Sequence, residues 1–382
     1  MRSKAFFLNG GAGRIICSIP ALEKYAETHD DFVIICEGGT DFLKGHPTLF
    51  AKAYDNWHKN LFQEKLIHMD LVTPEPYREW HYFNQKASLA QAFDIIINEL
   101  DEPRELPIPQ IVLTKNEICA GFTAVEEVKA GTGKDKLLVV QPFGRSVEQI
   151  GQDFIVDSTS RSFGLNNVVE IINKLKKDYA VIIMSEIHFP LEKDEHKSAS
   201  TMVARPEIQD MRLWAGIIHA ADHFLGCDSM GQHIAMALDT TTTMVCGSTY
   251  PINISYPDNK NMDIIDVGKD NGRFYSPIRV TMDEVVDRAN DECMEMTEAH
   301  KKAVIDSVKK RMGKPAAYTG NFQVQSKDYA NACCDKPQQP QQPKALPQSN
   351  KPKIKFDASK TKGFGQIETS NPDVKNILQK LK

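Results

Sequence analysis

Short apolar runs alternate with helical patterns along most of this chain, and this alternation constrains the fold more than any other feature. The runs are rich in β-branched or aromatic residues and are bounded by turn formers, which predicts strands at Ala5–Leu8, Phe32–Cys36, Leu137–Gln141, Ala180–Ser185, His223–Cys227 and Thr243–Gly247. Between them, helical spacing predicts helices at Ile15–Thr28, Lys86–Leu100, Asn166–Lys177, Met211–Ala221, Gly231–Leu238 and Asp283–Met312. Such alternation predicts an α/β protein with parallel sheets covered by helices on both faces.

The length of 382 residues is typical of two domains, or of one domain with a long appendage. The polar segment Glu126–Lys136 restarts the alternation, and we interpret it as the joint between two Rossmann-like domains, residues 1–130 and 131–313. Two such domains that face each other leave a cleft at the carboxyl ends of their strands, where ligands bind.

The C-terminal residues 314–382 differ in composition from the rest and are predicted to be a disordered tail. Residues 314–372 are interpreted mostly as a Pro-, Gln- and Lys-rich linker, and residues 372–381 have the spacing of a short helix, although a frayed terminus fits equally well. From residue 336 onward the net charge is +7, whereas the body carries −12. An acidic body disfavours nucleic acid as a partner, while the basic tail is suited to docking an anionic partner.

No apolar run approaches the roughly 20 residues that span a bilayer, so no transmembrane segment is expected. The apolar stretch near the N-terminus stops at Asn9 and is too short for a signal peptide. The eight cysteines are scattered without a Cys-x-x-Cys pair. We therefore expect a reducing, cytoplasmic location.

The segment after the predicted strand His223–Cys227 is the sharpest candidate site. Asp228 and Ser229 lie on the turn before a helix of small residues, with Gly231 and His233 in its first turns. This order points free N–H groups and a helix dipole toward the cleft, as phosphate binding requires. The alternative, in which Asp228 and Ser229 are plain helix caps and His233 is a core histidine, fits the pattern about equally well.

A second candidate follows the predicted strand Leu137–Gln141. Gly144 permits close backbone approach, and Arg145 and Ser146 offer charge and hydrogen bonds to a phosphate. Downstream, Arg161 precedes a predicted helix, and Glu186 follows a predicted strand, where an acidic side chain can accept hydrogen bonds from ribose. Each signal is weak alone, because surface Arg and Glu are usually solvated.

The third candidate, Asn9–Arg14, follows the first strand. Gly11 and Gly13 are present, but no third glycine completes a dinucleotide fingerprint. Gly131–Lys134 lacks the features of a P-loop and is interpreted as linker. The His219 and His223 pair lacks the glutamate of a zinc-protease motif, so we expect no metal site and no bound cofactor.

Taken in order, these segments resemble glycosyltransferase family 9, the heptosyltransferase-like group with GT-B architecture. The resemblance runs from about Phe6 to Val280 and is specific at a few places. Asp228-Ser229 with His233 and Ile234-Ala235 is similar to the family's Asp-Ser-Gly-x-x-His segment, with the glycine one place late as Gly231. Gly13–Leu22, which ends in Pro20-Ala21-Leu22, is similar to the family's first loop and helix.

The resemblance implies that the first domain holds the acceptor and the second holds a nucleoside diphosphate sugar, with metal-independent, inverting transfer. It implies that Gly144, Arg145, Ser146 and Arg161 bind the pyrophosphate, that Glu186 binds the ribose, and that Asp228, Ser229, Gly231 and His233 bind the sugar and phosphates. Cationic side chains and oriented N–H groups there stabilise the departing diphosphate.

One departure concerns the base that deprotonates the acceptor hydroxyl. The family usually places an aspartate directly after the first-loop glycine, whereas this chain has Arg14, which accepts no proton at neutral pH. Arg14 is instead suited to binding an anionic acceptor or the donor phosphate. Glu37, Asp41 and His81 are the candidate bases by position.

The leading hypothesis is an inverting GT-B glycosyltransferase that moves a heptose- or hexose-like sugar to the hydroxyl of a glycan or other acceptor. A catalytically silent nucleotide-sugar-binding or scaffold protein on the same fold is the alternative, motivated by Arg14 and by the tail. An NAD-dependent enzyme is disfavoured by the incomplete glycine pattern.

Overall fold

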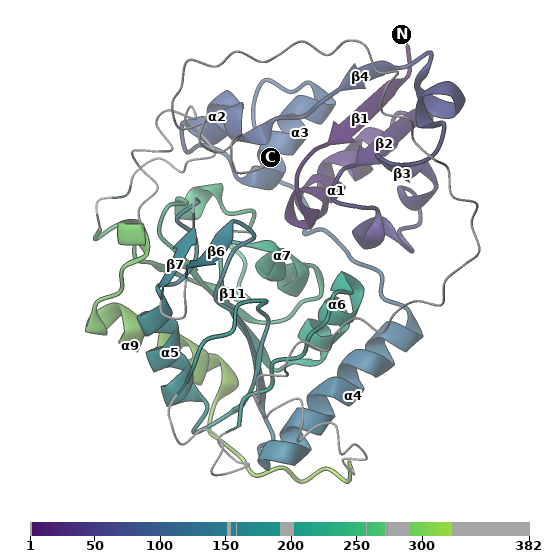
Figure 1. Ribbon diagram of the computed structural model, residues 1–382. Coiled ribbons are helices and arrows are strands. Elements are labelled where there is room, and N and C mark those ends of the chain that lie inside the picture. Colours follow the sequence, from purple (N-terminus) through teal and green to yellow (C-terminus); the bar gives the residue numbers. More distant parts are fainter. Residues whose placement is uncertain are drawn as a thin grey trace, which may run out of the picture. The chain divides into compact units, whose positions relative to one another are not determined.

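Two parallel sheets organise the described part of the chain in the computed structural model (Figure 1). The described residues are 2–150, 154–157, 159–191, 202–256, 258–271, 273 and 291–322. The predicted terminal helix at 372–381 and most of the predicted linker lie outside them. The prediction of parallel sheets with helices on both faces is confirmed.

The first sheet has four parallel strands in the order β3-β2-β1-β4. The strands are β1 (Lys4–Leu8), β2 (Phe32–Cys36), β3 (Ala53–Asp55) and β4 (Asp70–Val72). Helices α1 (Ala12–Ala26), α2 (Trp80–Phe83) and α3 (Leu89–Asn98) accompany it, with short helical turns at Asp41–Leu43, Phe50–Lys52, Phe62–Leu66 and Pro76–Arg78. Alternate residues of β1 enter different core clusters: Phe6 and Leu8 pack on the α1 side, and Ala5 packs on the other.

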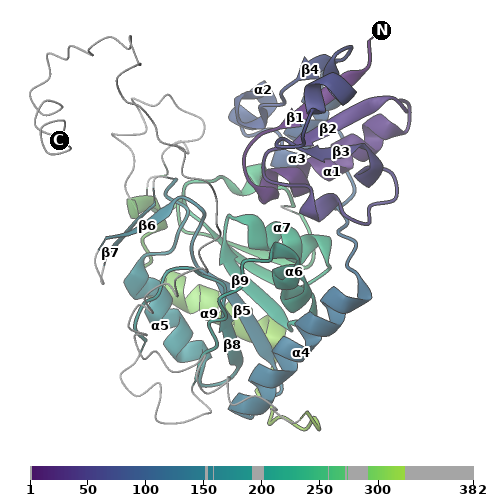
Figure 2. The ribbon, with the colours of Figure 1, turned by 45° about the vertical axis from the view of Figure 1, so that its right-hand side comes forward.

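The second sheet has five parallel strands in the order β11-β10-β9-β5-β8. They are β5 (Leu137–Gln141), β8 (Ala180–Ile183), β9 (His223–Cys227), β10 (Thr242–Cys246) and β11 (Met262–Asp266). The accompanying helices are α4 (Lys115–Thr132), α5 (Leu165–Leu175), α6 (Met211–Ala220), α7 (Met230–Ala237) and α9 (Glu298–Met312). Figure 2 shows α5 and α9 on one face of this sheet, and α4 and α6 on the other.

Strands β5, β8, β9 and β10 are buried along their whole length because both faces of this sheet are covered, whereas the edge strand β11 is mostly half-buried. Leu138 and Val140 pack into the core on the α5 and α9 side. Leu137 and Val139 pack with Trp214 of α6. An antiparallel hairpin, β6 (Val147–Ile150) and β7 (Phe154–Asp157), and turns at Pro251–Asn253 and Asp291–Met294 complete the described elements.

The polar segment Glu126–Lys136, predicted to be a joint, is mostly helical. Helix α4 continues to Thr132 and ends at Gly133, whose φ of 71° is the left-handed conformation that glycine accepts without strain. The prediction of Gly131–Lys134 as linker is therefore wrong for its first two residues. A helix that buries only a narrow face looks polar in sequence, and its N-terminal capping box of Thr114 and Glu117 was the missed signal.

The predicted helix Asp283–Met312 is wrong at its start. Asp291–Met294 forms a 3₁₀ turn, and α9 begins only at Glu298; residues 283–290 lie outside the described residues. The Thr297 side chain caps α9 by accepting a hydrogen bond from the His300 N–H at 3.2 Å. This cap, one residue before the helix, fixes where it begins.

Contacts between the two sheet regions are buried. Ile16 of α1 shares a core cluster with Ile234 of α7. Arg212 of α6 donates to the carbonyl oxygens of Asp41 and Val112, each at 2.7 Å, and pairs with the Glu117 carboxylate.

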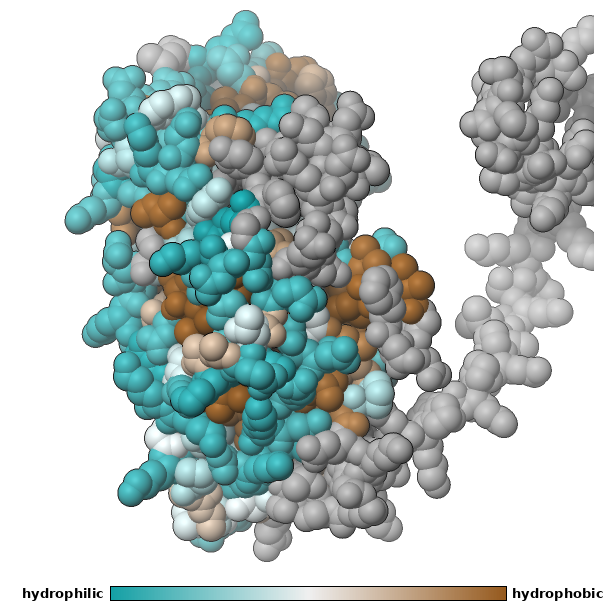
Figure 3. Space-filling model, turned by 90° about the vertical axis from the view of Figure 1, so that its left-hand side faces the viewer, coloured by the Kyte–Doolittle hydropathy of each residue, from teal (hydrophilic) through white to brown (hydrophobic). Residues whose placement is uncertain are grey.

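The face drawn in Figure 3 is mostly hydrophilic, with hydrophobic side chains in separate patches. No helix in the described ranges is long and apolar enough to cross a membrane.

Candidate functional site

A cavity of about 790 Å³ receives residues from both sheet regions. Gly11–Arg14, Tyr77, Tyr82 and Leu89 line it from the first region. The second region contributes residues that follow β5, β8, β9 and β10. The carboxyl ends of parallel strands meet at one sheet edge, which explains why segments distant in sequence converge here.

The N-terminus of α7 opens into this cavity. Ser229 lines it with extended backbone, and its side chain makes no capping hydrogen bond. The capping interpretation is therefore wrong for Ser229. The Gly231 N–H donates to Gln141 Oε1 at 2.8 Å, and a Cβ at Gly231 would lie 2.3 Å from that oxygen and 2.5 Å from Phe224 Cζ, so a larger residue would have to displace both side chains. Gly231 is buried and does not line the cavity; it allows close packing of α7 on β5.

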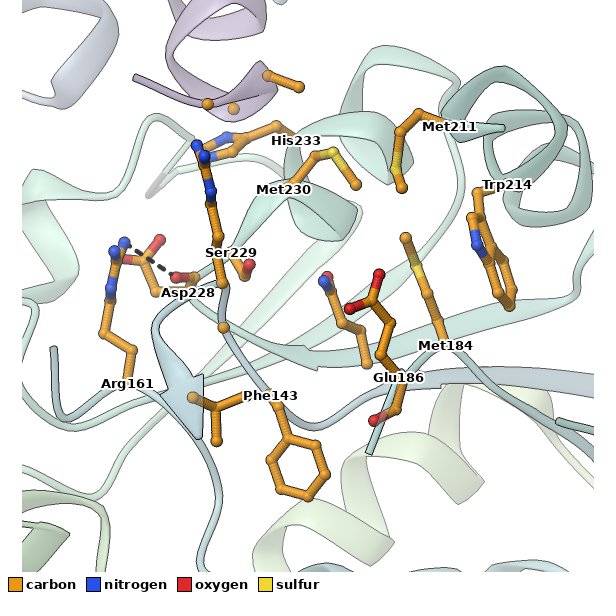
Figure 4. Close-up of a pocket in the computed structure, with 18 of the residues that line it drawn as sticks. Phe143, Arg161, Met184, Glu186, Met211, Trp214, Asp228, Ser229, Met230 and His233 are labelled. Atoms are coloured by element: carbon orange, nitrogen blue, oxygen red, sulfur yellow. Dashed lines mark hydrogen bonds and ion pairs between the residues drawn. The ribbon is translucent and has the colours of Figure 1, made fainter. Parts of the chain in front are cut away.

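Asp228 lines the cavity and is held from two sides. Its Oδ2 accepts from Thr249 Oγ1 at 2.7 Å, and its Oδ1 accepts from Gln232 Nε2. Its Oδ2 also lies 3.9 Å from Arg161 Nη1 (Figure 4). The carboxylate is therefore fixed beside the α7 N-terminus.

His233 combines the two roles that the sequence left open. It lines the cavity while only 5% of its surface is exposed, and its Nδ1 lies 3.3 Å from Cys17 Sγ of α1. Burial lowers the pKa of His233 to about 4. The imidazole is consequently neutral near pH 7 and can donate or accept one hydrogen bond at the cavity wall.

A buried carboxylate behind Arg161 organises its loop. Asp157 at the end of β7 accepts hydrogen bonds from the N–H groups of Thr159, Arg161 and Ser162 and from two hydroxyls. Burial alone would raise the pKa of Asp157, but hydrogen bonds from Ser162 and Thr159 outweigh it and lower the pKa. The loop directs Arg161 Nη1 toward the Asp228 carbonyl oxygen, 3.2 Å away.

The loop after β5 adds a second guanidinium. The Gly144 N–H donates to Ser162 Oγ at 2.9 Å, which joins this loop to that of Arg161. Gly144 and Arg145 line the cavity, but Ser146 is not among the lining residues. Arg145 Nη1 lies 3.3 Å from where a Cβ of Gly11 would be, so it reaches the first loop from across the cavity.

The other end of the cavity carries several apolar side chains. Met184, Met211 and Trp214 gather there, and Glu186 projects among them from the segment after β8 (Figure 4). Figure 4 places Arg161 and Asp228 at the opposite side. The cavity therefore has a cationic end and an apolar end, with Glu186 in the apolar one.

The first loop packs directly against the second region. A Cβ on Gly13 would lie 3.2 Å from His233 Cδ2, and Gly11 is the uncapped residue before α1. Arg14 turns back onto its own region. Its Nη2 donates to the Pro74 carbonyl at 3.0 Å, and its Nη1 lies 3.3 Å from Glu75 Oε1.

The three predicted bases lie outside the cavity lining. Glu37 accepts a hydrogen bond from the Gly10 N–H, and Asp41 pairs with Lys44. His81 Nδ1 lies 2.9 Å from Glu79, and its Nε2 lies 3.3 Å from Glu102. Their catalytic roles remain predictions.

Sequence patterns missed several lining residues because they come from loops and short helical turns, among them Tyr77, Arg205, Thr249 and Asn253. Both ring nitrogens of His223 bond threonine hydroxyls inside the sheet, Thr241 at 2.8 Å and Thr243 at 2.9 Å. Within the described ranges, no three His, Cys, Asp or Glu side chains are grouped to hold a metal ion.

Solved structures resemble this chain. A family 9 glycosyltransferase from Veillonella parvula DSM 2008 matches with TM-score 0.51 and 10% identity over 81% of this chain and 97% of that one. The ADP-heptose lipopolysaccharide heptosyltransferase II of E. coli matches with TM-score 0.49 and 10% identity, over 80% of this chain and 99% of that one. The dodecameric iron-containing glycosyltransferase TibC of enterotoxigenic E. coli H10407 matches with TM-score 0.48 and 13% identity, over 81% of this chain and 79% of that one.

No protein-family model matches this chain, and no curated protein matches it in sequence. The likeness to the Veillonella parvula structure concerns the fold, because the two sequences are only 10% identical. The predicted GT-B architecture of two Rossmann-like sheet regions is confirmed.

Proposed function

We propose that this chain, which has the fold of a family 9 glycosyltransferase, transfers a sugar from a nucleoside diphosphate sugar to an acceptor hydroxyl with inversion at the anomeric carbon. The observation that carries the proposal is the cationic end of the cavity, where the uncapped α7 N-terminus, Arg145 and Arg161 converge. Negative charge grows on the leaving diphosphate during transfer, and oriented N–H groups and guanidinium groups stabilise it.

The remaining lining residues suit the rest of the donor. Glu186 is a hydrogen-bond acceptor for the ribose hydroxyls, and Met184, Met211 and Trp214 offer an apolar surface for the base. Asp228 and His233 lie where the transferred sugar and its phosphate would be. The positive charge at the leaving group comes from protein groups, so we propose that transfer needs no bound metal.

Calorimetric titration and thermal shift test donor binding. We expect one of ADP, UDP or GDP, with its sugar derivative, to bind, whereas NAD and NADH do not. A ligand at 100 times its dissociation constant adds about 2.7 kcal/mol of stability. Arg161→Met should weaken binding, whereas Lys302→Gln, which removes an exposed charge on α9, should not. If none of these nucleotides binds to the wild-type protein or to Lys302→Gln, the proposed donor site is contradicted.

Turnover then separates enzyme from scaffold. We expect release of the nucleoside diphosphate from the bound donor, undiminished by EDTA, and a product of opposite anomeric configuration by NMR. Donor binding without any release would favour the silent binding protein. Loss of release in EDTA, restored by a divalent metal, would contradict metal-independent transfer.

A further inference from the structure

The acceptor side of the cavity needs a group that takes a proton. In the proposed transfer an acceptor hydroxyl attacks the anomeric carbon, and a hydroxyl is a weak nucleophile until a base removes its proton. After β1, the first turn of α1 presents Arg14 to the cavity, and a guanidinium cannot accept a proton at neutral pH. A base must therefore come from another segment that lies beside Arg14.

The segment after β4 lies beside the first loop. β4 pairs in parallel with β1, with Val72 opposite Phe6, so the chain leaves both strands at one edge of the sheet. Glu75 Oε1 lies 3.3 Å from Arg14 Nη1, and Glu75 Oε2 lies 3.5 Å from Asn9 Nδ2. Both carboxylate oxygens are thus positioned by first-loop side chains, one of which lines the cavity.

This segment also faces the cationic end. Tyr77, two residues after Glu75, lines the cavity, and its ring centroid is 5.0 Å from the Arg14 guanidinium carbon. Burial raises the pKa of the Tyr77 hydroxyl, while the charges of Arg161 and Arg14 act to lower it. Tyr77 therefore lies within electrostatic range of both guanidinium groups, and Glu75 precedes it on the same short turn.

We propose that Glu75 is the general base of the transfer, an inference that rests on the proposed function. Its side chain is 37% exposed, so the contacts with Arg14 and Asn9 leave room for an acceptor hydroxyl. Glu75 takes the hydroxyl proton while the acceptor oxygen bonds to the anomeric carbon. The bond from that carbon to the phosphate oxygen breaks, and its electron pair leaves with the nucleoside diphosphate. The proton on Glu75 then passes to water.

Glu75, like the three bases predicted by position, is not among the cavity-lining residues, and what distinguishes it from them is its contact with a lining side chain. Glu37 contacts the Gly10 backbone, Asp41 contacts Lys44, and His81 lies between two glutamates. Among the described residues, none of the three bonds a side chain that lines the cavity. Glu75 does so through Arg14.

The test uses the full-length protein with ADP-glucose, UDP-glucose and GDP-mannose, with water and then sodium azide as the acceptor. Water must lose a proton to attack, whereas azide is already an anion. Glu75→Gln and Glu75→Ala should lower nucleoside diphosphate release to water by about 100-fold or more, the usual share of a general base. Azide should restore release in Glu75→Ala and yield an inverted glycosyl azide. Glu64→Gln, a half-exposed glutamate of the same region, should behave as wild type.

Each other result counts against the inference. Wild-type release by Glu75→Gln overturns it, and a loss in Glu37→Gln instead would assign the base to Glu37. Lost release that azide does not restore, or weakened binding of the nucleoside diphosphate in Glu75→Gln, would make Glu75 structural. If wild-type protein releases no nucleoside diphosphate from any of the three donors, with or without azide, and calorimetry and thermal shift also find no nucleoside diphosphate that binds, the proposed function itself fails.

Discussion

Asp228 and His233 test the donor site at the scale of single residues. Asp228 holds Thr249 and Gln232 beside the α7 N-terminus, and His233 offers one hydrogen bond at the wall. Replacing either with alanine should weaken donor binding by about 1–3 kcal/mol, the range for losing a buried polar or charged contact. Titration calorimetry measures this effect, with Asp306→Ala on the exposed face of α9 as the control. If both alanine variants bind the donor with unchanged affinity, Asp228 and His233 have structural roles only.

Asp157 acts on the same site through Arg161. The two Asp157 oxygens accept hydrogen bonds from Thr159 and Ser162. Asparagine at this position keeps one accepting oxygen, but it loses the other acceptor and the negative charge. Asp157→Asn should lower the melting temperature and also weaken nucleoside diphosphate binding, whereas Arg161→Met should mainly weaken binding. Differential scanning calorimetry and titration distinguish the two effects. Unweakened binding by Asp157→Asn would show that Arg161 keeps its place without this carboxylate.

The site was predictable from sequence where its residues follow buried strands. Asp228, Arg145 and Glu186 come within four residues of the ends of apolar strands, and the carboxyl ends of such strands meet at one edge. Tyr77 and Glu75 follow β4, which has three residues and an exposed, polar start, so no run marked them. The contact of Arg14 with Glu75 joins two strands that are neighbours only in space, and one sequence contains no signal for it.

At the scale of elements, the pair of Glu117 and Arg212 joins α4 to α6. A hydrogen bond from Arg212 lowers the pKa of Glu117 to about 2. A depressed carboxyl pKa contributes stability above the unfolded value of about 4.3, and this contribution is lost as the pH falls toward 2. Glu117→Gln should therefore be less stable than wild type at pH 7, and the difference should shrink below pH 4. Denaturant unfolding across this range measures it; a difference independent of pH would exclude the charge as its cause.

Helices α4 and α6 also cross at a pair of glycines. A Cβ on Gly121 would lie 2.1 Å from the Gly216 carbonyl carbon. A Cβ on Gly216 would lie 2.4 Å from the backbone carbonyl oxygen of Glu117. Backbone cannot move aside as a flexible side chain can, so Gly121→Ala should destabilise the protein by about 1–3 kcal/mol or more. Thr123→Ala, at an exposed position of α4, is the control in thermal unfolding. Equal stability of the two variants would contradict this close crossing.

Element prediction succeeded for buried strands and failed for segments that sequence alone makes ambiguous. Strands β5 and β9 are buried at every position and mostly apolar, so their runs stand out in the sequence. Helix α4 buries only a few residues along its length, so its polar surface looked like a joint. The hairpin of β6 and β7 was missed because β6 is mostly exposed and carries no apolar run. Tertiary packing, which a single sequence does not display, decides such elements.

At the scale of the whole molecule, the chain divides into one unit of residues 1–335 and another of residues 336–382. The second carries a net charge of +7, with few apolar residues and many prolines. Such a composition has little apolar surface to contribute to a core. The protein truncated after Asp335 should therefore keep the melting temperature of the full chain and its affinity for the nucleoside diphosphate.

Thermal unfolding and titration of the two forms side by side measure this, at low and at high salt. A basic segment that docks an anionic partner does so through charges that salt screens, so any partner lost on truncation should also dissociate from the full chain as salt rises. A large fall in melting temperature on truncation would mean that residues 336–382 bury surface against the body. A fall in nucleotide affinity alone, at unchanged melting temperature, would mean instead that the basic segment contributes charge to nucleotide binding. Affinity would then fall more steeply with salt in the full chain than in the truncated one.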